Sequence, residues 1–305
     1  MGRAAAVGAG ALALALLASL GGCLPPAPPP ARAAPGDDRP LVLTTFTVLA
    51  DLAANVAGEH ARVESLTKVG VEIHGYEPTP GDVTRAAGAD LVLDNGLGLE
   101  TWFERFVDRA DVPHVVVSAG IVPIEIDGEP GRVDPHAWMS PGNAQEYVRT
   151  IAAALAELDP GNSTAYAANA ASYAAEIAAV HGAALAALAE VPVAHRVLVT
   201  CEGAFGYLAR DLGLRDHSLW PLNGEAQVTP RRMAAVVDVV RAEEVPAVFC
   251  ESTVSPATMA QVAAETGAHL AGILHVDSLS GPDGPVPTYL DLLRHDVDAI
   301  VAGLT

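Results

Sequence analysis

The sequence is 305 residues long and carries 17 Lys and Arg against 37 Asp and Glu, a formal net charge of -20. At about 100–200 residues per domain, this length predicts two domains. Half of the chain is hydrophobic and only 18% is charged, which excludes wholesale disorder. The acidic balance argues against nucleic acid or an anionic membrane surface as a partner, because both attract basic patches.

The N-terminus has the pattern of an export signal. Arg3 precedes an uncharged apolar run over residues 4–20, and small residues then lead into Cys23. We interpret residues 1–22 as a secretory signal peptide and Cys23 as a lipidated first residue, as in a bacterial lipobox. An ordinary signal with an incidental cysteine is the alternative. Residues 23–40 are rich in Pro and Ala, which predicts an extended tether. The protein is therefore expected to be exported, and either lipid-anchored to the outer face of the cytoplasmic membrane or periplasmic.

Two further cysteines, Cys201 and Cys250, remain once Cys23 is set aside. Export permits a disulfide between them, but both could equally be small buried side chains at strand ends. The sequence leaves these alternatives open.

From residue 41 onward, short apolar runs alternate with helical patterns, which predicts βαβ units. Strands are expected at 41–46, 63–66, 91–93 and 114–117, and again at 197–200, 218–222, 247–250 and 269–275. Continuous apolar runs are typical of strands buried on both faces of a parallel sheet. Thr79 and Pro80 have the pattern of an N-cap and first helical residue, with Asp82 in the first turn. We therefore expect an α/β fold of two lobes, each with a small parallel sheet flanked by helices.

Between the two halves lies an alanine-rich segment. Residues 162–190 contain no Pro and one Gly, Gly182. Because Ala is the best helix former, this segment predicts one helix of about 29 residues, about 43 Å long. A coiled-coil seam is the alternative, but no heptad repeat persists. We assign 41–160 to the first lobe, 161–190 to a rigid linking helix and 191–305 to the second lobe.

Four polar residues follow predicted strands, two in each half: His74, His136, Glu202 and Asp277. In open α/β sheets, ligands bind at the carboxyl ends of the strands. If these edges face each other, two imidazoles and two carboxylates converge in one cleft between the lobes. Such a set suits Mn²⁺, Fe²⁺ or Zn²⁺, and a bound dication removes the repulsion between the carboxylates. We call these four residues the candidate ligands.

The remaining histidines have less distinctive settings. We expect surface positions for His60, His181, His195 and His295. His275 lies two residues before Asp277 and could be a fifth ligand or a packed strand histidine.

Residues 41–304 resemble the solute-binding lipoproteins of manganese, zinc and iron ABC importers. The matching stretches are Tyr76-Glu77-Pro78-Thr79-Pro80-Gly81-Asp82, Asn95-Gly96-Leu97-Gly98-Leu99-Glu100, Asp134-Pro135-His136-Ala137-Trp138, Thr200-Cys201-Glu202-Gly203-Ala204-Phe205-Gly206-Tyr207 and Glu251-Ser252-Thr253-Val254. In that family the metal ligands occupy the places of the four candidate ligands. The resemblance implies an extracytoplasmic, monomeric receptor that delivers a divalent metal ion to a permease and ATPase.

Two features of the resemblance concern the metal. Zinc importers typically have His at the third ligand position, whereas manganese importers have Glu in a Glu-Gly-Ala-Phe context, as at Glu202. Many zinc members also carry a long His-rich loop where residues 121–133 are short and contain no His. The resemblance therefore favours Mn(II), with Zn(II) or Fe(II) as alternatives.

Two other functions are alternatives, a metal-dependent hydrolase and a surface adhesin. Catalytic zinc usually keeps three protein ligands and one open position, whereas four candidate ligands can close the shell. The chain has no His-Glu-x-x-His and no Gly-x-Ser-x-Gly sequence. We therefore expect a receptor and not an enzyme; the adhesin role is neither indicated nor excluded by the sequence.

Overall fold

The computed structural model describes residues 37–103, 106, 112–222 and 228–305. The predicted signal peptide, Cys23 and most of the predicted tether lie outside the described residues. Residues Arg39–Thr305 form one unit.

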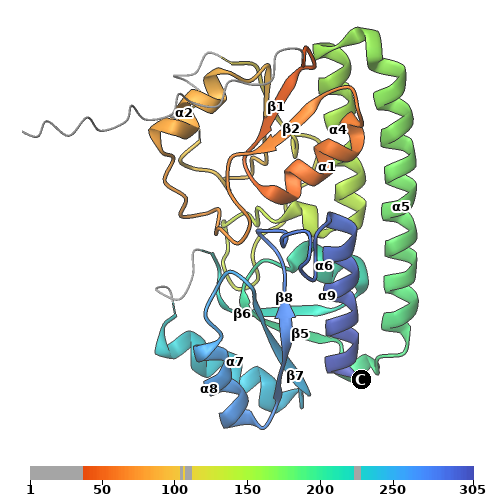
Figure 1. Cartoon of the computed structure of the whole chain (residues 1–305). Helices are drawn as coiled ribbons and strands as arrows, with labels where there is room; N and C mark the ends of the chain where they lie inside the picture. Colours follow the sequence, from red (N-terminus) through yellow and green to blue (C-terminus); the bar gives the residue numbers. More distant parts are fainter. Residues whose placement is uncertain (1–36, 104–105, 107–111, 223–227) are drawn as a thin grey trace, which may run out of the picture. The chain divides into compact units, whose positions relative to one another are not determined.

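The first lobe is built on a parallel four-stranded sheet in the order β2-β1-β3-β4 (Figure 1). Its strands are β1 (Leu41–Thr44), β2 (Arg62–Ser65), β3 (Leu91–Asp94) and β4 (His114–Val116). Its helices are α1 (Thr47–Ala57), α2 (Pro80–Ala87) and α4 (Pro141–Leu158), with a 3-10 turn η1 (Ala137–Met139) before α4. α2 begins as predicted, because the Thr79 side chain and Asp82 form a reciprocal capping box and Pro80 opens the helix.

The second lobe contains two parallel strand pairs, β5 with β6 and β7 with β8, and β5 also lies against β7. Its strands are β5 (Val197–Glu202), β6 (Arg215–Trp220), β7 (Ala247–Glu251) and β8 (His269–Leu274). Its helices are α6 (Gly206–Leu212), α7 (Pro230–Ala242), α8 (Ala257–Thr266) and α9 (Tyr289–Leu304). Short 3-10 turns η2 (Pro160–Asn162) and η3 (Val193–His195) flank the segment that joins the lobes.

The joining segment is the single helix α5 (Ser163–Ala189), 27 residues long. In Figure 1 it runs beside both lobes, and it packs against α1 and α4 of the first and against α6 and α9 of the second. By length and composition α5 could cross a membrane. Its buried residues, among them Tyr166, Tyr173 and Ile177, recur at helical spacing. That stripe faces the neighbouring helices, so α5 is a structural element of the folded unit.

All eight predicted strands are present, each with bounds that differ from the prediction by one to three residues. β5 continues through Glu202, which is its last residue and does not follow the strand. β6 begins at Arg215, before the predicted start at residue 218, and ends at Trp220. Its first residues are charged or polar, so the apolar pattern used for prediction misses them.

One hydrophobic cluster extends through both lobes. It includes Phe46 and Trp138 of the first lobe, whose ring centroids lie 4.8 Å apart, and Phe249 and Tyr289 of the second. The Tyr289 hydroxyl donates to the carbonyl of Trp138, and the Trp138 indole donates to the carbonyl of Val276 at 3.2 Å. The two lobes therefore share packed side chains directly beside the candidate ligands.

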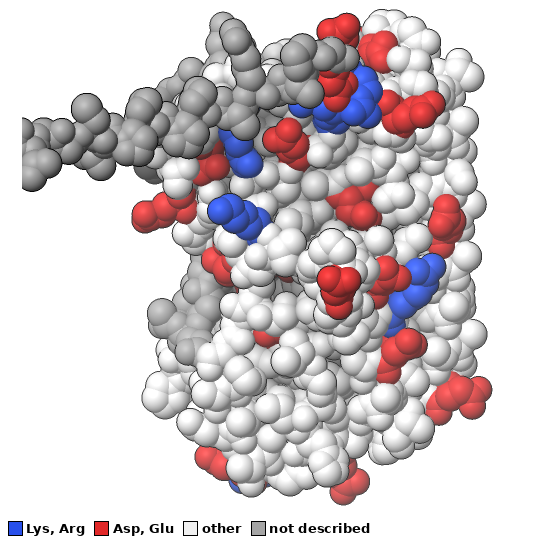
Figure 2. Space-filling view, viewed as in Figure 1, with Lys and Arg blue, Asp and Glu red and all other residues white. Residues whose placement is uncertain are grey.

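Acidic side chains outnumber basic ones on the face of the molecule shown in Figure 2. Figure 2 shows Asp and Glu scattered across one face, with Lys and Arg among them. Among the described residues on that face, no continuous basic area is visible.

Candidate metal centre

The structure brings the candidate ligands together from four separate segments. His74 lies in the loop between β2 and α2, and His136 lies directly before η1. Glu202 ends β5, and Asp277 lies just beyond β8. Each lobe thus supplies two of the four residues, at the carboxyl side of its strands.

His74, His136 and Asp277 form one group, and Glu202 is outside that group but approaches its two histidines. The Nε2 atoms of His74 and His136 lie 3.0 Å apart. Glu202 Oε1 lies 3.3 Å from His74 Nε2 and 4.0 Å from His136 Nε2. Asp277 Oδ1 lies 3.9 Å from His136 Nε2. One ligand atom each of His74, His136 and Asp277 lies within 4.8 Å of the others, as a shared cation requires.

Burial makes this arrangement unfavourable without a cation. His136, Asp277 and Glu202 are exposed by 0%, 1% and 2%, and both carboxylate oxygens of Asp277 lack a hydrogen-bond partner among the described residues. A buried carboxylate that is neither paired nor hydrogen-bonded is costly. Burial accordingly raises the pKa of Asp277; His136 opposes this shift, and the nearby carboxylate of Glu72 adds to it. A divalent ion would neutralise this charge.

The imidazole of His74 is held in the form that coordinates metals. Burial lowers the pKa of His74 well below its ordinary value, and the charges of His136 and Arg132 add to this effect. A neutral imidazole is the form that coordinates a metal ion. The loop is fixed locally by Glu72, whose carboxylate accepts the backbone N–H groups of His74 and Gly75 at 2.5 and 2.8 Å.

His136 is oriented by Asp134. The Oδ1 atom of Asp134 lies 2.8 Å from His136 Nδ1 and also accepts the backbone N–H of His136 at 2.9 Å. The main chain of Asp134 is held in turn by Tyr207, whose hydroxyl donates to its carbonyl at 3.0 Å. A carboxylate on one ring nitrogen fixes the tautomer and leaves the other nitrogen for a metal. His136 Nε2 therefore faces the other candidate ligands.

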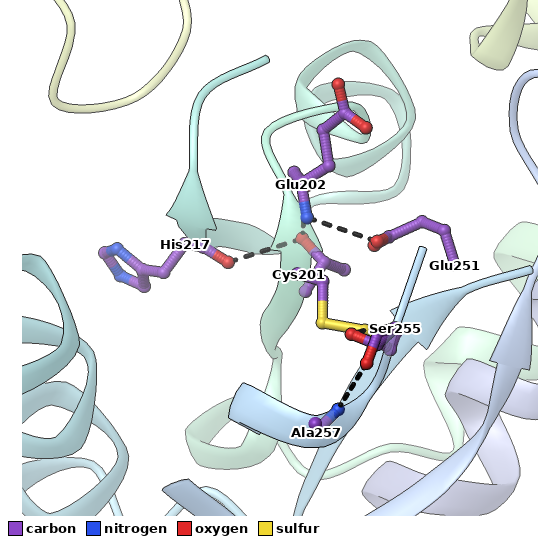
Figure 3. The surroundings of a disulfide bond; sticks show 8 residues. Cys201, Glu202, His217, Glu251, Ser255 and Ala257 are labelled. Atoms are coloured by element: carbon purple, nitrogen blue, oxygen red, sulfur yellow. Dashed lines mark hydrogen bonds between the residues drawn. A yellow bond between two sulfur atoms is a disulfide. The ribbon is translucent and has the colours of Figure 1, made fainter. Parts of the chain in front are cut away.

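Glu202 is held by its neighbours across the second lobe. Its backbone N–H donates to Glu251 Oε2 at 3.2 Å. A disulfide joins Cys201, the residue before Glu202, to Cys250, the residue before Glu251 (Figure 3). The disulfide resolves the alternatives that the sequence left open. Burial raises the pKa of Glu251 to about 8, so this side chain is largely protonated at neutral pH.

His275 takes the packed arrangement. Its ring lies edge-on against His295, with centroids 5.1 Å apart, and its backbone N–H donates to Asp296 Oδ1 at 2.9 Å. Burial lowers the pKa of His275 to about 4. The contact with His295 corresponds to the packed strand histidine, the second of the two alternatives for His275.

Three residues at this centre were not singled out from the sequence: Glu72, Asp134 and Glu251. Glu72 lies two residues before His74, Asp134 lies two residues before His136, and Glu251 begins the stretch Glu251-Ser252-Thr253-Val254. A carboxylate two residues before a candidate histidine is a usable indicator, because it can reach the backbone or ring of that histidine.

Comparison with known proteins identifies the family. Residues 42–303 match the family described as "Zinc-uptake complex component A periplasmic". The chain belongs to this family. It is an extracytoplasmic metal-binding receptor of an ABC importer and not an enzyme, and its cargo is a divalent metal ion.

The proteins similar to this chain are described as binding different metals. The chain is 49% identical over 265 residues to the iron-binding protein YfeA of Yersinia pestis, covering 86% of this chain and 85% of YfeA. It is 34% identical to the manganese-binding lipoprotein MntA of Halalkalibacterium halodurans, covering 87% and 88% of the two chains.

Solved structures of this zinc-uptake family share the fold. The Mn-bound periplasmic metal-binding protein of Candidatus Liberibacter asiaticus superposes with a TM-score of 0.83 at 37% identity, covering 88% of this chain and 100% of that one. The periplasmic zinc-binding protein TroA of Treponema pallidum gives a TM-score of 0.81 at 27% identity, covering 88% and 99%. The expected fold of two lobes with a long joining helix and a buried site between them is confirmed.

Proposed function

We propose that this receptor captures Mn(II), holds it with His74, His136, Glu202 and Asp277, and passes it to the permease of its importer. The observation that carries the proposal is the buried carboxylate of Asp277, whose oxygens have no hydrogen-bond partner in the described part of the chain and of which Oδ1 lies 3.9 Å from His136 Nε2. Two imidazoles and two carboxylates give a mixed nitrogen and oxygen donor set suited to a divalent transition metal.

The preference for manganese rests on the third ligand position. A carboxylate at Glu202 in place of an imidazole adds a hard oxygen donor, and Mn(II) favours such donors more than Zn(II) does. The Mn-bound structure from Candidatus Liberibacter asiaticus and the manganese-binding MntA are consistent with this choice. Iron is the second candidate metal, since the 49% identical YfeA is described as iron-binding.

Zinc is the alternative cargo, favoured by the family description and by the similarity to TroA. Metal analysis of the protein purified from cells without added metal distinguishes these choices. We expect manganese, with iron as the minor metal. Zinc as the retained metal in cells grown with ample manganese would contradict the proposal.

Alanine variants test the four ligands. His74→Ala and Asp277→Ala should each weaken Mn(II) binding by more than about 100-fold, because even residues that only orient a ligand change metal affinity by about 10–100-fold. His181→Ala is the control and should bind normally. Isothermal titration measures all three, and full affinity in Asp277→Ala would remove this residue from the site.

The anchor and the partners complete the proposal. A lipid on Cys23 would hold the receptor at the membrane beside the permease, with the ATPase on the inner face. We propose that the receptor works as a monomer, and that it binds no nucleic acid. Mass spectrometry of the mature N-terminus should show a diacylglycerol-modified Cys23, and an unmodified N-terminus would contradict the anchor.

A further inference from the structure

A cleft of about 290 Å³ opens beside His74. The cleft is lined by residues 97–99, Thr101, residues 131–133 and Leu222. His74 lines this cleft and is 9% exposed, the most of the four candidate ligands. An ion approaching from solvent through this cleft therefore meets His74 first.

Leu97 in the wall of this cleft has an unusual backbone. Its φ is 55°, between Gly96 at 79° and Gly98 at 81°. Left-handed backbone is costly for a residue with a side chain, and among the described residues only Leu97 and Glu244 adopt it without being glycine. The segment thus holds a bulky apolar side chain at a place where a third glycine would be unstrained.

A buried carboxylate holds this segment in place. Glu100 is 5% exposed, and it accepts the backbone N–H groups of Asn95 and Gly96 at 2.8 and 3.2 Å and the Thr45 hydroxyl at 2.7 Å. These bonds fix the chain directly before Leu97. The left-handed turn is therefore built into the first lobe, and Leu97 is anchored as part of the wall.

The lining of the cleft also carries a positive charge. Arg132 lines the cleft with His74 and also lines a neighbouring cavity of about 540 Å³. The guanidinium of Arg132 therefore lies in the same cleft as His74, the first candidate ligand that an entering ion meets. A guanidinium beside the approach to a cation site opposes the entry of a divalent ion.

We propose that this cleft is the port through which the metal ion enters and leaves, with Leu97 as a steric gate and Arg132 as an electrostatic barrier. The proposal rests on the proposed function but concerns exchange rates, not ligand identity. Because Leu97 has no donor atom, it affects the passage of the ion and leaves the bound state unchanged. Its removal should therefore change the association and dissociation rates by the same factor.

The variant Leu97→Gly tests the steric gate, since it removes the side chain and relieves the left-handed strain. Glu244→Gly is the matched control, because Glu244 has a φ of 49° and lies in the turn between α7 and β7. Stopped-flow mixing with Mn(II) would measure the association rate. Mixing the loaded protein with a chromogenic chelator would measure the dissociation rate, at chelator concentrations high enough that the observed rate no longer depends on them. Thermal unfolding of the metal-free variants confirms that both fold.

We expect Leu97→Gly to raise both rate constants about tenfold, as if about 1.4 kcal/mol were removed from the barrier, with Kd unchanged. Glu244→Gly should leave both rates at the wild-type values. Unchanged rates in Leu97→Gly with normal stoichiometry would overturn the port and leave the proposed function intact. A change in Kd through the dissociation rate alone would make Leu97 part of the site and not a gate. A wild-type protein that binds no Mn(II) would remove both proposals.

Arg132→Gln tests the electrostatic barrier. Its association rate for Mn(II) should exceed that of the wild type at low ionic strength, and the gain should shrink as salt screens the charge. A gain that does not depend on salt, or no gain at all, would overturn the role of Arg132.

Discussion

Asp134 shows how one carboxylate can prepare a metal ligand. It contacts both the ring and the backbone of His136 and so fixes the tautomer that leaves Nε2 for the ion. Asp134→Ala should lower Mn(II) affinity about 10–100-fold. Asp134→Asn, which keeps an acceptor oxygen, should lose less. Titration calorimetry measures both, and wild-type affinity in Asp134→Ala would show that packing alone orients His136.

Glu251 gives the metal-free protein a characteristic pH dependence. The pKa of Glu251 is about 8 in the folded protein, because of burial, against an ordinary value of 4.5. Between pH 4.5 and pH 8, Glu251 therefore carries a proton in the folded state but not in the unfolded state. The raised pKa of Glu251 stabilises the fold fully below pH 4.5, and this stabilisation is lost as the pH rises through 8.

Glu251→Gln should remove this dependence, since an amide stays neutral and still offers an oxygen to the Glu202 N–H. Between pH 5 and 8.5, metal-free wild type should lose at least about 1 kcal/mol of unfolding free energy relative to the variant, given about 1.4 kcal/mol per pKa unit. Urea unfolding at several pH values measures the difference, and parallel curves would contradict the raised pKa.

The candidate ligands could be found from the sequence because each lies near the end of a recognisable strand. The contacts of Asp134 and Glu251 could not be predicted from the sequence, because they depend on which atoms come together once the helices and strands have packed. The disulfide is a similar case. Whether Cys201 and Cys250 approach to a Cα distance of 4.9 Å depends on how β5 lies against β7, which neither strand encodes alone.

Among the elements, α5 sets the mechanical behaviour of the molecule. A single helix of 27 residues makes the chain crossing, and the hydrophobic cluster continues from one lobe into the other. Hinge motions need a few residues that absorb large changes in backbone angle, and an uninterrupted helix offers none. The local composition that predicts α5 therefore also predicts a stiff receptor.

Small-angle scattering should accordingly give the same radius of gyration with and without Mn(II). The response to metal should be confined to loops around the site, chiefly near Glu202 and Asp277. Hydrogen exchange of the two forms would locate it there. A large compaction on addition of metal would contradict the role assigned to α5.

At the scale of the whole molecule, metal binding should dominate stability. An ion that binds the native site and not the unfolded chain adds about 4 kcal/mol when its free concentration is about 1,000 times Kd. Differential scanning calorimetry with and without Mn(II) at pH 7.5 should show a correspondingly higher Tm.

This stabilisation should shrink as the pH falls. A proton on His74 or Asp277 competes with the metal ion. The pKa of Asp277 is raised by burial, so this competition begins at a higher pH than for an ordinary aspartate, while the lowered pKa of His74 delays its own protonation. The gain in Tm should therefore be clearly smaller at pH 5 than at pH 7.5. An equal gain at both values would show that the ion is held by groups other than these.

The most direct measurement is a crystal structure of the Mn(II)-loaded protein with anomalous scattering data collected above the manganese absorption edge. We predict one strong anomalous peak per chain, within coordination distance of His74 Nε2, His136 Nε2, Glu202 and Asp277. A peak elsewhere, or a peak that any of these four side chains fails to contact, would contradict the assignment of the site.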